Sequence, residues 1–307
     1  MNDIAQIKAN AEKIHDVIAP ANIIGGMHAL TNENHVQNLE KTMLDMPQAQ
    51  CYVEHHFGAG VYIRQVTIPA GVFSVGHYQK KEHFNHMVEG RVIMLNDDGT
   101  TSDLVAPKMF VSQPGRKIGF IVEKMVWLNI YPTDETDIDT LEEMFLDKSP
   151  TWMSDLETKS KIEYVSRHTD REDYKNMLQE TSGGGGDVFS MAHFTNSEPL
   201  PFPSGSYKVK IADSHIQGRG VYVTSTVKEG EAIAPAVIDG QPTPVIQYIN
   251  HAKNPNVKLV NINGQIELVA LKDIEGAHGG QSGTEATINY RHPVLMAQEE
   301  EYLCQPQ

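Results

Sequence analysis

The sequence predicts a mainly β protein made of two β-rich units joined by helical and irregular segments. Short segments rich in β-branched and aromatic residues, punctuated by Gly and Pro, fill residues 51–132. A second set of such segments fills residues 206–292. The stretch "TSGGGGDVFS" lies between the two sets, and its four consecutive glycines are typical of a flexible linker.

The N-terminal segment, residues 1–50, is expected to be helical. Apolar residues recur there at helical spacing in two stretches: Ile4, Ile7, Ala11, Ile14 and Ile18, then Val36, Leu39 and Met43. Pro20 follows the first stretch and Pro47 the second, and proline commonly marks the end of a helix. We therefore expect two helices before the first β-rich unit.

The first β-rich unit contains four clear strand-forming segments: "VYIRQVTIPAGVFSVGHY", "HMVEGRVIML", "KMFVSQPG" and "KIGFIVEKMVWLNIYP". The stretch "LNDDGTT" predicts a hairpin turn between strands. Many short strands at such intervals are typical of a β-sandwich or small barrel.

An acidic helical connector is expected at 133–181, where Leu141, Met144 and Phe145 could form one packing stripe. A Gly- and Pro-rich linker follows at 182–205. The second unit then shows strands at "YKVKIADS", "GRGVYVTS", "VKLVNING" and "QIELVALKDI", and residues 293–307 form a tail.

Composition limits the kinds of partner. The chain has 307 residues and a formal net charge of −15, which argues against nucleic acid and anionic membranes. Cys51 and Cys304 form neither a disulfide framework nor a zinc-binding spacing, which is consistent with a reducing compartment. The first twenty residues lack the features of a secretory signal, and no apolar run is long enough to span a membrane. We therefore expect a cytoplasmic protein.

Four motifs in the second unit occur in a specific order. "GRGVY" is followed by "QYINHAKNPNVKL", and then by "ALKDI" and "TINY". This order resembles the SET domain, the β-rich fold of protein-lysine methyltransferases. The resemblance covers residues 206–292.

The resemblance implies binding of S-adenosylmethionine. Gly218, Arg219, Gly220, Asn250 and His251 would bind this cofactor. Tyr290 would direct its hydroxyl at the transferring methyl group, and Tyr248 would line the lysine channel. Methyl transfer requires mainly alignment and desolvation of the reactants.

The second unit also departs from the family pattern. Only "APAVIDGQPTPVI" separates "EGEAI" from "QYINHA", where the family has a far longer insert that forms one wall of the substrate groove. Gln247 replaces the usual arginine, and "GAHGGQS" interrupts a compact turn. These departures leave activity open, because a fold can persist after its chemistry is lost.

The first unit has a resemblance of its own. "GVFSVGHYQKKEHFNHMVEGRVIML" and "VSQPGRKIGFIV" resemble the two motifs of cupins, and "WLNIYPTDETDIDTLEEMF" resembles cupin-type proteins from phage genomes. The resemblance implies a β-barrel or jelly roll and raises the question of a divalent metal. His77, Glu82 and His83 are the candidate ligands. The alternative, histidines hydrogen-bonded inside the barrel, stays open because the second motif contains no histidine.

Three functions are compatible with these features. The first is an S-adenosylmethionine-dependent protein-lysine N-methyltransferase with a cupin-like targeting or oligomerising domain. The second is a non-catalytic phage adaptor or structural protein, in the virion or the host cytoplasm, with degenerate cupin and SET domains. The third is a metal-dependent cupin enzyme. The expected partner is a protein substrate or a phage or host protein, and the cupin-like unit could form a homo-oligomer.

Overall fold

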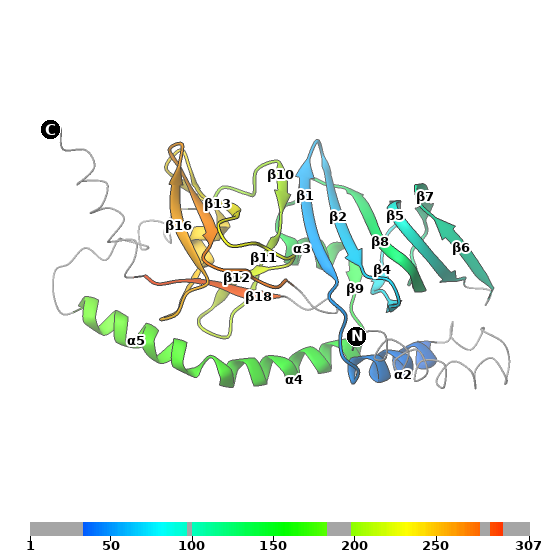
Figure 1. The fold of residues 1–307 in the computed structure, drawn as a ribbon, viewed down its shortest axis with the longest axis horizontal. Coiled ribbons are helices and arrows are strands. Elements are labelled where there is room, and N and C mark those ends of the chain that lie inside the picture. The colour runs from blue at the N-terminus through cyan, green and yellow to red at the C-terminus, as the bar shows by residue number, and fades with distance from the viewer. Residues whose placement is uncertain (1–32, 97–99, 183–197, 277–282, 291–307) are drawn as a thin grey trace.

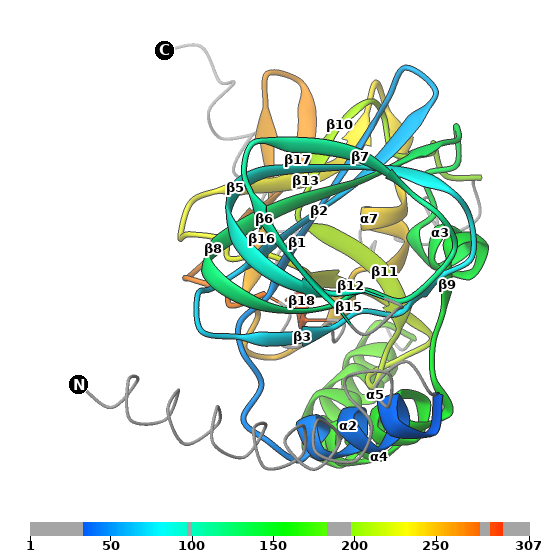
Figure 2. The same cartoon turned by 90° about the vertical axis from the view of Figure 1, so that its right-hand side faces the viewer.

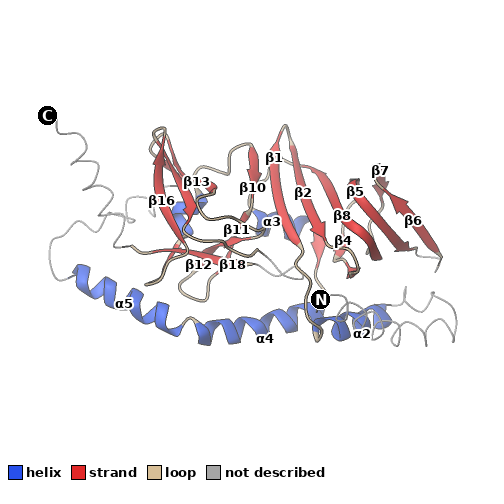
Figure 3. Ribbon diagram, in the orientation of Figure 1, coloured by secondary structure: helices blue, strands red, loops and turns tan. Residues whose placement is uncertain are grey.

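Strands dominate the computed structural model, as the sequence predicts (Figure 3). The structure describes residues 33–96, 100–182, 198–276 and 283–290. The helix expected around Ile4–Ile18, the glycine run of the linker and the tail at 293–307 lie outside the described residues. The mainly β class is confirmed.

Among the described residues, the first half of the chain holds most of the large first sheet, a two-stranded sheet of β4 and β9, and four helices. Its elements are α2 (Glu33–Leu44), β1 (Tyr52–Gly58), β2 (Val61–Ile68), β3 (Phe73–Val75), β4 (Tyr78–Gln79), β5 (His83–Leu95), β6 (Thr101–Val105), β7 (Lys108–Ser112), β8 (Ile118–Pro132), α3 (Ile138–Phe145), β9 (Leu146–Asp147), α4 (Pro150–Ser166) and α5 (His168–Ser182).

The second half holds two further sheets. Its elements are β10 (Gly205–Tyr207), β11 (Val209–Asp213), β12 (Arg219–Val223), β13 (Ala232–Ile238), β14 (Gln241–Pro242), α7 (Pro244–Tyr248), β15 (Asn250–His251), β16 (Val257–Ile262), β17 (Gln265–Ala270) and β18 (Thr284–Ile288).

The first sheet has the order β10-β1-β2-β8-β5-β6, with β3 paired to β8 and β7 paired to β5. Its strands curve strongly, and they trace an oval when the molecule is viewed from that end (Figure 2). Within the described residues β10 and β6 remain the two ends of the sheet, so the expected closed barrel is wrong. The apolar alternation of the strands explains the curved sheet but cannot specify whether its edges meet.

Strand β5 passes straight through "VEGRV", where the cupin resemblance implies a hairpin. Its register against β8 shifts between Met87 and Glu89 and again between Glu89 and Arg91. Gly90 has a φ of +97°, and a Cβ at this position would lie 2.2 Å from the Lys124 carbonyl oxygen. Gly90 therefore allows a β-bulge inside a long strand; it does not form a turn between two strands.

The second half packs against the first through strands and a shared core. β10 pairs with β1. In addition, the Val53 N–H donates to the Thr224 carbonyl oxygen at 3.1 Å, and the Thr224 hydroxyl donates to the Val53 carbonyl oxygen at 2.7 Å. One cluster of buried apolar side chains includes Phe57 and Tyr131 from the first sheet together with Val209 and Leu268 from the second half. Strand pairing and a shared apolar core therefore hold the two β-rich units together.

Helices α2, α4 and α5 run along one side of the molecule, below the strands in Figure 1. Ser149 caps α4 by accepting from the Trp152 N–H, and Pro150 occupies the first turn, where its missing N–H costs nothing. Of the helices that the structure describes, none combines the length and apolar character that a membrane span requires.

Candidate functional site

Asn250 ties three separate stretches of the second unit together. It lies on β15, which runs parallel to β18. Its side-chain Nδ2 donates to the carbonyl oxygens of Gln217 (3.1 Å) and Arg219 (2.9 Å) and to Glu285 Oε1 (2.9 Å). The glycine-containing loop, the Asn-His pair and the last strand therefore converge, as the motif order predicts.

His251 is fully buried and both of its ring nitrogens are engaged. The Tyr290 backbone N–H donates to Nδ1 at 3.1 Å, so Nε2 carries the hydrogen that is directed at Asp173 Oδ2, 2.7 Å away. Asp173 belongs to α5, and Tyr174 on the same helix lies with its ring centroid 6.5 Å from that of His251. Helix α5 therefore covers the imidazole.

Tyr290 lies beside this pair. Its hydroxyl donates to the Ile249 carbonyl oxygen at 2.6 Å, and its ring centroid is 5.3 Å from that of His251. Burial, then the neighbouring Tyr174 and then Glu285, raise the pKa of the Tyr290 phenol. The phenol therefore stays protonated at neutral pH and acts as a hydrogen-bond donor.

The two glycines of the "GRG" turn have different roles. Gly218 adopts a φ of +54°, and no atom lies within 4 Å of the position that a Cβ would occupy. At Gly220 a Cβ would lie 2.4 Å from Glu285 Oε1, so only glycine leaves room for this carboxylate. Burial raises the pKa of Glu285, and its Oε2 is a buried oxygen with no hydrogen-bond partner among the described residues.

Arg219 and Tyr248 form a separate contact. The Arg219 guanidinium lies 5.3 Å from the centre of the Tyr248 ring, and its Nη2 donates to Asp139 Oδ2 at 2.6 Å. An acidic depression in front of α3, lined by Asp139, Glu142 and Asp213 among others, includes Arg219. The Arg219 guanidinium therefore contacts both the Tyr248 ring and a carboxylate of α3.

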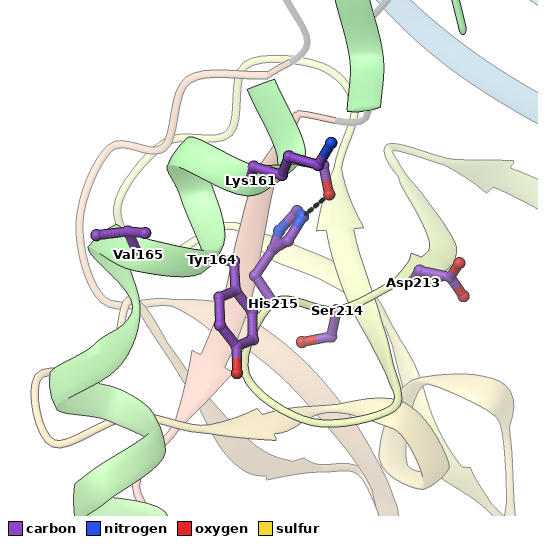
Figure 4. A pocket seen from close by; sticks show the side chains of 7 residues that line it. Lys161, Tyr164, Val165, Asp213, Ser214 and His215 are labelled. Atoms are coloured by element: carbon purple, nitrogen blue, oxygen red, sulfur yellow. Dashed lines mark hydrogen bonds between the residues drawn. The ribbon is translucent and has the colours of Figure 1, made fainter. Parts of the chain in front are cut away.

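A second depression, of about 540 Å³, lies between α4 and the loop that precedes Gly218 (Figure 4). Its walls are Ser160, Lys161, Tyr164 and Val165 from α4, and Asp213, Ser214 and His215 from the loop. The Ser160 hydroxyl lies 2.7 Å from His215 Nε2, and Arg171 donates to the His215 carbonyl oxygen at 2.8 Å. Helices α4 and α5 are therefore hydrogen-bonded to the loop that precedes the predicted cofactor-binding residue Gly218.

The three candidate metal ligands do not come together. His83 donates through Nδ1 to the Lys81 carbonyl oxygen, and its Nε2 lies 3.1 Å from the Lys117 ammonium. Glu82 accepts a hydrogen bond from Gln113, and His77 packs edge-on against Trp152. No three His, Cys, Asp or Glu side chains cluster as ligands within the described residues. The residues present therefore do not fit a divalent metal, because a cation beside Nε2 would repel the ion.

Two residues of the centre were not predicted from the sequence. Asp173 and Tyr174 lie in a polar stretch of the connector, whose residues offer no pattern that points to a site. Their role depends on where α5 packs. Only the excess of acidic residues in the connector could have suggested a partner for a buried histidine.

Comparisons with known proteins identify no relative by sequence: no protein-family profile and no curated protein matches the chain. Among solved structures, the chain is similar to ectoine synthase from P. lautus, at 13% identity and a TM-score of 0.27 over 35% of this chain and 86% of that one. It is also similar to an RmlC-like cupin from Methanocaldococcus jannaschii, at 12% identity and a TM-score of 0.24 over 27% of this chain and 81% of that one. A cupin domain from Bordetella pertussis is similar at 15% identity and a TM-score of 0.24, over 28% of this chain and 95% of that one.

Proposed function

We propose that the second unit is an S-adenosylmethionine-dependent protein-lysine N-methyltransferase whose centre is held closed by α5. The observation that carries this proposal is the position of Tyr290. Its hydroxyl lies against the Ile249 carbonyl oxygen, directly before the Asn250–His251 pair, although Tyr290 is 39 residues beyond His251. The resemblance to SET domains predicts this convergence.

The cofactor supplies an electrophilic methyl group on a sulfonium. The Ile249 carbonyl oxygen and the Tyr290 phenolic oxygen together present negative partial charge, which stabilises a positively charged methyl donor. Burial of Tyr290 excludes water and strengthens this interaction. No proton needs to leave the phenol in this role.

One unpartnered acceptor at the centre also fits a cationic ligand. Glu285 accepts from Asn250 through Oε1, and its Oε2 is buried without a hydrogen-bond partner within the described part of the chain. Gly218, Arg219 and Gly220 would hold the cofactor through their backbone, with Asn250 and His251 alongside. Because Asp173 already binds His251, we expect α5 to move aside when the cofactor enters.

Calorimetric titration with S-adenosylmethionine tests the proposal. The wild-type chain should bind weakly, and Asp173→Ala should bind at least about tenfold more tightly, because the variant loses a charge-assisted hydrogen bond that closes the site. Tyr290→Phe should fold normally and transfer no methyl group to lysine peptides. An exposed pair on α4 supplies the control: Glu157→Ala, which breaks an ion pair with Lys161, should leave binding unchanged.

The second candidate function is a non-catalytic adaptor, favoured by one specific observation. Each nitrogen of the Asn250 and His251 side chains is already bonded within the chain. Groups that are satisfied in this way can serve the fold alone. If neither the wild-type chain nor Asp173→Ala binds the cofactor at millimolar concentration, the methyltransferase proposal is wrong and the non-catalytic adaptor is the better proposal.

A further inference from the structure

A row of polar side chains crosses the buried face of the first sheet, apart from the Asn250–His251 centre. His55 on β1 lies opposite Arg64 on β2, and Arg64 lies opposite Asn129 on β8. Directly opposed residues point to the same face of an antiparallel sheet. Tyr62 and Tyr131 are opposed in the neighbouring row, and the Tyr62 hydroxyl lies 2.8 Å from His55 Nδ1.

Three buried nitrogens in this region have no hydrogen-bond partner in the part of the chain that the structure describes. They are His55 Nε2, Arg64 Nε and His77 Nδ1. The guanidinium nitrogen of Arg64 can only donate. When His55 Nδ1 accepts from the Tyr62 hydroxyl, its Nε2 carries the hydrogen and is a donor as well. The missing partner is therefore an acceptor.

The charge of the region makes this acceptor an anion. Glu142 on α3 is the carboxylate whose pKa Arg64 helps to lower, but its Oε2 accepts from Lys148 at 2.7 Å and its Oε1 lies 3.7 Å from Lys210. Glu142 is therefore shared among three cations, and no ion pair joins Arg64 directly to a carboxylate of the described residues. A half-buried arginine whose charge is only partly compensated is costly, and an anionic ligand would offset that cost.

The surrounding rings limit the size of the ligand. Ring centroids of Tyr131 lie 6.0 Å from Tyr62, 5.2 Å from His83 and 4.1 Å from Phe145. His55 is only 2% exposed, whereas Arg64 is partly exposed and can meet a solute. A ligand would therefore approach beside Arg64, and rings packed this closely favour one of few atoms.

We propose that the buried face around Arg64 binds a small carboxylate, with the planar guanidinium as its ion partner and His55 Nε2–H as a second donor. A guanidinium presents two parallel N–H groups that match the two carboxylate oxygens. No metal takes part, and the site is independent of the methyl-transfer centre.

Acetate titration of the full chain tests this site, with sodium chloride keeping the ionic strength constant. We expect saturable binding by calorimetry, a rise in Tm with acetate concentration, and a shift of the His55 ring nitrogen signals in NMR. Arg64→Met should weaken acetate binding at least about tenfold. Arg91→Met is the matched control, because Arg91 is an exposed arginine of the same sheet that already pairs with Asp103.

Arg64→Lys keeps the positive charge and the aliphatic part of the side chain but lacks the two parallel N–H groups of a guanidinium. This variant should therefore fold normally and bind acetate less tightly than the wild type. Equal acetate affinity in Arg64→Met, or no saturation in the wild type, would overturn the proposal. Saturation by inorganic phosphate but not by acetate would show that the site is not built for carboxylates. S-adenosylmethionine binding should be the same in Arg64→Met and wild type, which separates this test from that of the methyltransferase.

Discussion

The imidazole of His55 shows how burial controls protonation. Burial first, and then the charges of Arg64, Lys210 and His56, lower the pKa of His55 to about 3, while Glu142 acts in the opposite direction. In the unfolded chain a histidine titrates near pH 6.5. Between these two values the unfolded chain binds more protons, so the free energy of unfolding decreases as the pH falls.

We predict that His55→Gln flattens this dependence. His55 should contribute a slope of about 1.4 kcal/mol per pH unit below pH ~6. Urea unfolding at several pH values between 6.5 and 4.5 measures it. His168→Gln on the exposed surface of α5 serves as control and should keep the wild-type slope. An unchanged slope in His55→Gln would show that other groups govern acid sensitivity.

Residue types near the candidate centre could be predicted, but their partners could not. The motif order brings Asn250, His251 and Tyr290 to one place, and the structure places them in contact. The sequence gives no sign that α3 supplies Asp139 as a partner of Arg219. Partners from distant elements leave no local pattern in the sequence.

Strand β5 shows the same limit at the scale of an element. Its alternating burial around His83, Asn85 and Met87 follows from the period of a strand. The bulge at Gly90 does not, because glycine is equally typical of a turn. Other elements were missed altogether: β13 contains Pro235, and α7 has only five residues.

We predict that Gly90→Ala is much more destabilising than Gly240→Ala. Both glycines have positive φ, +97° and +77°, so each alanine costs about 1 kcal/mol in backbone strain. At Gly90 the Cβ also meets the Lys124 carbonyl, whereas at Gly240 it meets nothing within 4 Å. Gly90→Ala should therefore lose at least about 3 kcal/mol in denaturant unfolding. Equal losses would mean that the bulge relaxes freely.

At the scale of the whole molecule, the shared core predicts that both halves unfold together. Leu268 on β17 is fully buried in the cluster that contains Phe57 and Tyr131 of the first sheet. Trp127 and Trp152, the two tryptophans, both lie in the first half. Leu268→Ala should lower stability by about 2–5 kcal/mol, and tryptophan fluorescence should report the same loss.

Far-UV circular dichroism of Leu268→Ala should give the same unfolding midpoint as the fluorescence. Leu178→Ala on α5 is the control, since Leu178 is 44% exposed, and should cost well under 1 kcal/mol. A fluorescence midpoint that stays at the wild-type value in Leu268→Ala would show that the two halves unfold independently.

The sequence by itself determined the mainly β class and the positions of most strands, because local periodicity and turn residues depend on neighbours along the chain. The expectation that "GRG", "NH" and "TINY" meet came from the resemblance to SET domains and not from periodicity. Only the tertiary structure decided that the first sheet stays open, that α5 covers His251 through Asp173, and that His55 and Arg64 meet on one buried face. These features depend on strand register and helix packing, which are fixed by contacts between residues far apart in the chain.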